Sequence, residues 1–391
     1  MTWHRILFAV LPVLLATASL GQQLPAGFEH FYNLEYDEAI NYFRKEVADQ
    51  PNNPEAHNHL AQAMLYRDMY RAGALESELV SRGNSFLRRK NMEISPENAK
   101  IFNDSISKSI SLSEARIAKN PKDVRALYAA GVAHGLRANY NFLVRKAWVD
   151  ALKDAGTGRK YHNRITEIDP NFMDARLMQG LHDYVIGSLP TFYKMLGFVA
   201  GFRGDKEVGI KTVQLVAEKG DTNRYDAQVL LSVIHRREKK SDKAIPILKG
   251  LVDRFPRNYL LRLELAQMYG DTGNKEQALA IFRAVEDLKM RNAPGYANLP
   301  MEKIYFYRGT LLFWYNDLDQ ALDQMRRVTP KAKELDLNTA LMSWMRVGQI
   351  LDLKGDRKQA LEAYRQAIAL APESEAAKES KGYLSSPYKR T

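Results

Sequence analysis

The stretch that decides the fold is residues 344–372, which read WMRVGQILDLKGDRKQALEAYRQAIALAP. Its apolar and small residues recur at spacings of three and four, which predicts two helices separated by a turn at Gly355. Gly348 and Ala360 are small at the positions where two antiparallel helices would cross closely, and Pro372 would end the second helix. The stretch therefore predicts a helical hairpin.

The same spacing recurs upstream with a fixed period. Ala278 is followed four positions later by Phe282, and the same small-then-large pair occurs 34 positions earlier. That earlier pair is Ala244 and Leu248. A nine-residue insertion at residues 292–300 separates these units from the later ones. The pattern resembles the tetratricopeptide repeat, and the resemblance implies an all-α fold, an α-solenoid of antiparallel helical hairpins.

The N-terminal half shows the same features in a more diverged form. Apolar spacing predicts further first helices of hairpins around residues 127–131 and 176–180. Ser95 followed by Pro96 predicts the N-cap and the first residue of a longer helix. We therefore expect residues 22–220 to form a diverged half of the solenoid.

The rest of the chain has a clearer organisation. Residues 221–385 are expected to form recognisable repeats that end in a capping helix at residues 373–385. Residues 386–391 are expected to be a flexible tail. Alternating apolar and polar runs bounded by turn residues are missing from the sequence, so no strand is expected.

The N-terminus has the pattern of a secretory signal peptide. Residues 1–21 contain the single charged residue Arg5, an apolar run and then small residues, and cleavage is expected after Gly21 or, less favourably, after Ala18. The alternative is an uncleaved anchor, although the apolar run is shorter than a spanning helix of about 20 residues. We expect a protein exported by a Sec-type signal to the periplasm or cell envelope. The absence of cysteine suits an oxidising compartment.

An apolar segment at residues 184–202 has one charged residue, Lys194. Gly187 and Pro190 divide it into pieces too short to span a bilayer, so it is either a buried hairpin or an element at a membrane surface. The region 180–220 resembles the corresponding part of eukaryotic tetratricopeptide proteins of the inclusion-body-clearance type. That resemblance implies a non-enzymatic adaptor linked to membranes or to protein quality control.

Motifs that would indicate catalysis or cofactor binding are missing from the sequence. It contains no phosphate-binding glycine loop, no dinucleotide fingerprint, no nucleophile elbow and no zinc-protease motif. His57 and His59 are the closest histidine pair, but on a helix they would point to different faces. We expect no enzyme, no cofactor and no bound metal.

The chain is basic, with 57 Lys and Arg against 46 Asp and Glu and a net charge of +11. Basic clusters at residues 88–90 and 236–240 are not accompanied by stacking aromatic residues or a nucleic-acid-binding motif. We therefore interpret these clusters as solvated helix faces and expect no nucleic-acid partner.

The resemblance to tetratricopeptide proteins implies a concave groove lined by the first helix of each hairpin. Family positions 2, 5, 9 and 12 of each unit would face it; exposed aromatic and methionine side chains there would suit a peptide or a helix. The alternative is that these side chains pack against the neighbouring repeat or the insertion. The positions are Asp226, Val229, Val233, Arg236, Leu263, Gln267, Lys303, Phe306, Thr310, Phe313, Met342, Met345, Gln349 and Asp352.

These observations favour a non-catalytic exported scaffold or adaptor that binds a protein or peptide partner in its groove. The Lys and Asn residues of the family's carboxylate clamp are missing from positions 5 and 9, so a receptor for carboxylate tails is disfavoured. The alternative function is a membrane-peripheral protein that docks on lipid through residues 184–202, helped by its positive charge.

Overall fold

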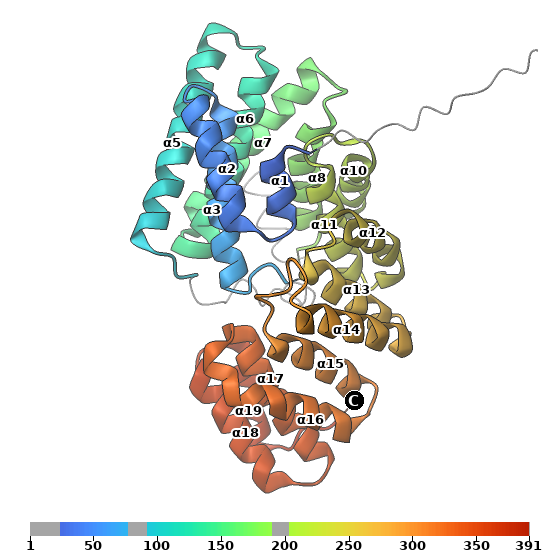
Figure 1. Ribbon diagram of the computed structural model, residues 1–391. Coiled ribbons are helices and arrows are strands. Elements are labelled where there is room, and N and C mark those ends of the chain that lie inside the picture. The colour runs from blue at the N-terminus through green and yellow to red at the C-terminus, as the bar shows by residue number, and fades with distance from the viewer. Residues whose placement is uncertain (1–23, 77–91, 190–202, 391) are drawn as a thin grey trace, which may run out of the picture.

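The computed structural model describes residues 24–76, 92–189 and 203–390, and these residues form helices and connecting turns without a strand (Figure 1). Consecutive helices pack against each other along the chain, as in a solenoid. The expected all-α fold of antiparallel helical hairpins is confirmed.

The helices of the N-terminal half begin where the sequence supplies caps. Ser95 accepts a hydrogen bond from the backbone N–H of Asn98, and Pro96 is the first helical residue, as predicted. In chain order, the elements are α1 (Ala26–Tyr32), α2 (Tyr36–Asp49), α3 (Pro54–Arg71), α5 (Pro96–Lys119), α6 (Val124–Tyr140), the π-helical turn η2 (Asn141–Arg145), α7 (Trp148–Ile168), the 3-10 turn η3 (Met173–Ala175), α8 (Arg176–Gly187) and α10 (Lys206–Lys219).

The helices of the C-terminal half follow the repeat pattern, and α19 lies where the capping helix is expected. The elements are α11 (Arg224–Arg237), α12 (Ser241–Arg254), α13 (Tyr259–Asp271), α14 (Lys275–Met290), α15 (Met301–Trp314), α16 (Leu318–Val328), the 3-10 turn η4 (Thr329–Glu334), α17 (Leu337–Leu353), α18 (Arg357–Leu370) and α19 (Glu375–Ser385).

Small residues allow the paired helices to approach closely. At Gly348 in α17, a Cβ atom would lie 2.5 Å from the ring of Tyr364 in α18. Ala360, the second small position of the same hairpin, is completely buried. The close crossing expected from the sequence is therefore present, and the buried ring of Tyr364 fills the space that the missing side chain leaves.

The solenoid curves so far that its N-terminal helices contact its C-terminal half. Arg254 at the end of α12 forms an ion pair with Glu29 of α1 at 2.7 Å, and Arg257 forms one with Glu35 at 2.6 Å. Apolar side chains join the same contact, and this shared core contains Phe28, Phe31, Tyr32, Tyr36, Phe43, Met64, Leu248, Phe255, Leu261 and Met268. Tyr32 of α1 and Tyr225 of α11 pack with their ring centres 5.6 Å apart, so α1 lies against the beginning of α11 (Figure 1).

Some expectations concern residues outside the described ranges. The signal peptide at residues 1–21, the basic cluster at 88–90 and most of the apolar segment lie there. In the described part of that segment, Tyr184 is buried among the apolar side chains of α10 and α11. Among the described residues, no helix combines the length and apolarity required to cross a membrane.

Candidate functional site

The predicted groove residues lie on the inner helices, but the chain itself already contacts most of them. On α11, Arg236 forms ion pairs with Glu264 at 3.3 Å and with Asp271 at 3.2 Å. On α13, Leu263 is buried and Gln267 is partly buried. These three positions therefore contribute to the contact between neighbouring repeats.

Lys303 of α15 is buried beneath a segment that arrives from the end of α3. It forms ion pairs with Glu76 and, at 2.9 Å, with Asp336. The charges of these two carboxylates outweigh burial and raise the pKa of Lys303. Tyr307 also donates a hydrogen bond to Glu76. This buried cluster joins the N-terminal half of the chain to α15 and α17.

The aromatic groove positions are not exposed. Phe306 and Phe313 are 1% and 0% exposed, and both belong to the C-terminal core together with Met345. Gln349 is buried and accepts a hydrogen bond from Arg346 at 2.7 Å, while Thr310 is partly buried. For these residues the alternative interpretation applies, because they pack against other parts of the chain.

The tail also differs from the expectation of a flexible segment. Tyr388 and Arg390 contact the ends of α17 and α15, and the backbone N–H of Tyr388 donates to Asp352 at 2.7 Å. A buried carboxylate needs hydrogen-bond donors, and the tail supplies one of them.

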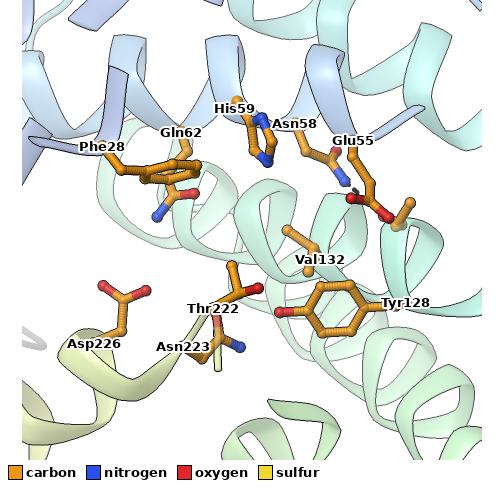
Figure 2. Close-up of a pocket in the computed structure, with 11 residues that line it drawn as sticks. Phe28, Glu55, Asn58, His59, Gln62, Tyr128, Val132, Thr222, Asn223 and Asp226 are labelled. Carbon is orange, nitrogen blue, oxygen red and sulfur yellow. Dashed lines mark hydrogen bonds between the residues drawn. The ribbon is translucent and has the colours of Figure 1, made fainter. Parts of the chain in front are cut away.

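An open cavity remains on the inner face between α1, α3, α6 and the beginning of α11 (Figure 2). It contains about 460 Å³ of space, part of it open to solvent. Its lining mixes carboxylates, amides and aromatic rings, and consists of Phe28, Glu55, Asn58, His59, Gln62, Tyr128, Ala129, Val132, Thr222, Asn223 and Asp226.

A buried carboxylate positions the α11 side of this cavity. Asp174 accepts hydrogen bonds from the backbone N–H groups of Asp221, Thr222 and Asn223, at 3.0, 3.0 and 3.1 Å. These bonds fix the turn that precedes α11. As a result, the first turn of α11 presents Asp226 toward the cavity (Figure 2).

The Asp226 carboxyl group has an unusual electrostatic environment. Burial and, to a smaller extent, the nearby charge of Asp174 raise its pKa to about 6, and a hydrogen bond with Tyr32 only partly offsets these effects. The side chain of Asp226 is partly buried and lines the cavity. No cation of the described residues forms an ion pair with it, so its charge is uncompensated.

The opposite wall of the cavity contains an acceptor that lacks a hydrogen-bond donor. Asn58 of α3 donates a hydrogen bond to the carbonyl of Ala129 at 2.8 Å, but its buried Oδ1 has no partner among the described residues. Buried acceptors are normally satisfied, because an unmet hydrogen bond is costly. The carboxylate of Asp226 makes the cavity suitable for a positively charged group that carries hydrogen-bond donors.

Two further polar side chains of the cavity are Tyr128 and His59. Burial raises the pKa of Tyr128 well above its ordinary value, so this hydroxyl is neutral at physiological pH. His59 contacts Glu46 at 3.1 Å and packs edge-on against Phe28. Within the described ranges, no three His, Asp or Glu side chains gather as metal ligands.

Part of this cavity could be anticipated from the sequence. Asp226 is among the predicted groove positions, whereas Asn58 and Tyr128 come from the diverged half, where no repeat register could be assigned with certainty. The sequence contains no signal that brings Asp174 to the turn before α11, because it lies 47 to 49 positions away from the residues of that turn.

The sequence was compared with models of known protein families. Two family models of the tetratricopeptide repeat match residues 225–297 and 342–374. The chain therefore contains tetratricopeptide repeats in its C-terminal half.

Solved structures with a similar course of the chain were also found. Yeast Tom70 matches at 12% identity with a TM-score of 0.41, covering 92% of this chain and 93% of that one. Cut9, in the APC/C hetero-tetramer Cut9–Hcn1, matches at 12% identity with a TM-score of 0.42, covering 92% and 74%. A repeat-containing protein of Cytophaga hutchinsonii matches at 13% identity with a TM-score of 0.29, covering 91% and 98%. Among curated protein sequences, no significant match to this chain is found.

Proposed function

We propose that this protein is a non-catalytic adaptor that binds a protein partner on the inner face of its solenoid and receives a basic side chain of that partner in the cavity. The observation that carries this proposal is the uncompensated carboxylate of Asp226, which faces the cavity. Tetratricopeptide repeats serve as protein-interaction scaffolds, which agrees with such a role.

The chemistry of the cavity favours a Lys or Arg side chain of the partner. A cation beside Asp226 would compensate its charge. The aromatic rings of Phe28 and Tyr128 line the same space and would pack along the aliphatic stem of such a side chain. Binding would therefore be electrostatic at the head and apolar along the stem.

Site-specific photocrosslinking tests this proposal. A photoreactive benzophenone side chain at Thr222, an exposed residue at the cavity edge, should crosslink a partner in the native host. The same probe at the exposed Lys249 of α12 is the control, because Lys249 does not line the cavity. The adduct should weaken when Asp226→Asn is added. Identical adducts at both probe positions, or an adduct insensitive to Asp226→Asn, would contradict the proposal.

We also propose that the protein is exported and works in the periplasm or cell envelope. The supporting pattern is the signal-like composition of residues 1–21, and the first described helix begins shortly afterwards at Ala26. N-terminal sequencing of the protein purified from its host should give Gln22 as the first residue. An N-terminus at Met1 in a cytoplasmic fraction would contradict export.

The alternative proposal is docking on a membrane surface through residues 184–202. It depends on the apolar composition of a segment whose residues 190–202 lie outside the described ranges. Co-sedimentation with anionic liposomes tests it: binding that is lost in Phe198→Asp would favour it, and absence of binding by the unchanged protein would exclude it.

A further inference from the structure

The C-terminal tail, residues 386–390, folds back from α19 onto the ends of α15 and α17. The backbone N–H of Tyr388 donates to Asp352 Oδ2 at 2.7 Å. The guanidinium of Arg390 donates to Asn316 Oδ1 at 2.8 Å and to the carbonyl oxygen of Phe313 at 2.5 Å. The tail is thus held by hydrogen bonds from its main chain and from one cation.

Contacts that do not involve the tail hold the surface on which the tail packs. The Asp352 side chain is 1% exposed, and it also accepts hydrogen bonds from Arg357 at 2.9 Å and from the hydroxyl of Tyr364 at 2.8 Å. These two side chains belong to α18 and fix the carboxylate in place. The oxygen that accepts the N–H of Tyr388 is Oδ2, the same atom that accepts from the Tyr364 hydroxyl.

An aromatic ring forms the second part of the receiving surface. The guanidinium of Arg390 lies 4.9 Å from the ring centre of Phe313, and that of the buried Arg346 lies 4.2 Å from it. The ring of Tyr388 lies 6.1 Å from Phe313. Arg390 also lies at the C-terminal end of α15, where the helix dipole and the unpaired carbonyls favour a cation.

Only alternate residues of the tail face this surface. Pro387 and Lys389 are exposed, whereas Tyr388 and Arg390 are partly buried against α15 and α17. This alternation is typical of the way in which proteins bind extended peptides. Main-chain hydrogen bonds provide affinity, and every second side chain contacts the protein surface. The contacts of the described tail residues come from the main-chain N–H and the ring of Tyr388 and from the guanidinium of Arg390, two positions further on.

We propose that the surface formed by Phe313, Asn316 and Asp352 is a second peptide-binding site, which the chain's own tail occupies in the free protein. The partner that fits is an extended segment with a tyrosine two residues before an arginine. This site lies on α15 and α17 and is separate from the cavity between α1, α3, α6 and α11, so it extends the proposed function to a second contact with a partner.

Occupation by the tail has a measurable consequence. A tethered segment has a high effective concentration, of the order of millimolar for a short flexible link. A free peptide therefore binds the unchanged protein with an affinity reduced by the fraction of molecules in which the tail is released. We expect the reduction to be about tenfold or more.

The test uses a fluorescent peptide with the sequence of residues 384–391, LSSPYKRT, and a matched control peptide, LSSPAKAT. Fluorescence anisotropy should show saturable binding of the first peptide to the full chain carrying Tyr388→Ala and Arg390→Ala, and at least about tenfold weaker binding to the unchanged chain. The control peptide should not bind the tail variant.

A variant of the receiving surface supplies the second test. Asn316 has a positive φ of 66°, which glycine adopts readily, so Asn316→Gly removes the acceptor of Arg390 without straining the turn. Added to the tail variant, it should weaken binding of the peptide several-fold. In the unchanged protein, hydrogen exchange should show the amide of Tyr388 protected, and Arg390→Ala should reduce that protection.

Three results would overturn this inference. They are absence of saturable peptide binding to the tail variant at millimolar concentration, equal binding to the tail variant and the unchanged chain, and equal binding of the two peptides. Asp226→Asn should leave all these measurements unchanged, so failure of the second site can be distinguished from failure of the cavity proposal.

Discussion

Replacing Asp226 by asparagine should stabilise the protein at neutral pH, although it removes the group proposed to bind the partner. Asparagine keeps an oxygen that can accept the hydrogen bond of Tyr32 but has no charge that must be buried. A binding site commonly retains a group that costs stability, because that group is needed for the ligand. Stability and binding should therefore change in opposite directions in this variant.

The magnitude follows from the pKa of Asp226, which burial raises from 3.8 to about 6. Because the folded state holds this proton more tightly than the unfolded chain, the group costs no stability below about pH 3.8 and its full cost is present above pH 6. The full cost is about 3 kcal/mol at pH 7.5, and about 0.5 kcal/mol remains at pH 4. Asp226→Asn should recover these amounts.

Thermal melting measured at pH 7.5 and pH 4 tests this prediction. With a melting entropy of roughly 2.1 cal/mol/K per residue, 3 kcal/mol corresponds to an increase of about 4 °C at pH 7.5, and almost none is expected at pH 4. Asp253→Asn is the matched control, because Asp253 is exposed on α12 and has the same change of charge. An increase of the same size at both pH values, or in the control, would refute the electrostatic argument.

Three further predictions concern the fold. Gly348→Ala should lower the free energy of unfolding by about 1–3 kcal/mol, because its Cβ would clash with the buried ring of Tyr364, and denaturant titration measures this. Lys303→Met should lower the free energy of unfolding by about 3–5 kcal/mol, because it leaves Glu76 buried without a cation. Adding Glu76→Gln should restore part of this stability. A double variant that is no more stable than Lys303→Met would contradict the argument. Burial lowers the pKa of His162 to about 4, so the unfolded chain takes up a proton at a higher pH than the folded protein does. Stability should therefore fall as the pH drops from 6.5 to 4. Melting curves of His162→Gln should lack this part of the pH dependence.

The helices could be predicted because their signals are local. The spacing within residues 344–372 reveals a hairpin in a single window, and Ser95 with Pro96 identifies a helix start from two adjacent residues. Each depends on contacts within one hairpin or one helix turn. The same is true of the close crossing at Gly348, which requires only its partner helix.

Occupation of the groove could not be predicted, because it depends on residues far apart in the sequence. Glu76 reaches Lys303 across more than half of the chain, and the contact exists only because the solenoid curves back on itself. Phe313 is one of the predicted groove positions, but Tyr388 and Arg390 pack against its ring. The repeat pattern predicts the face of the helix on which a side chain lies. It contains no information on which distant residues pack against that side chain.

Asp226 and Asp352 occupy opposite ends of their helices within equivalent repeats, and their different surroundings explain why one inner site is open and the other is filled. Asp352 has three kinds of donor, Arg357, the Tyr364 hydroxyl and the N–H of Tyr388, and the last of these comes from the tail. Among the described residues, Asp226 has the Tyr32 hydroxyl as its donor. A buried carboxylate is stable when donors surround it and costly when they do not. The tail therefore supplies a donor to Asp352 within the chain itself. A basic side chain of the partner would supply the corresponding donor to Asp226.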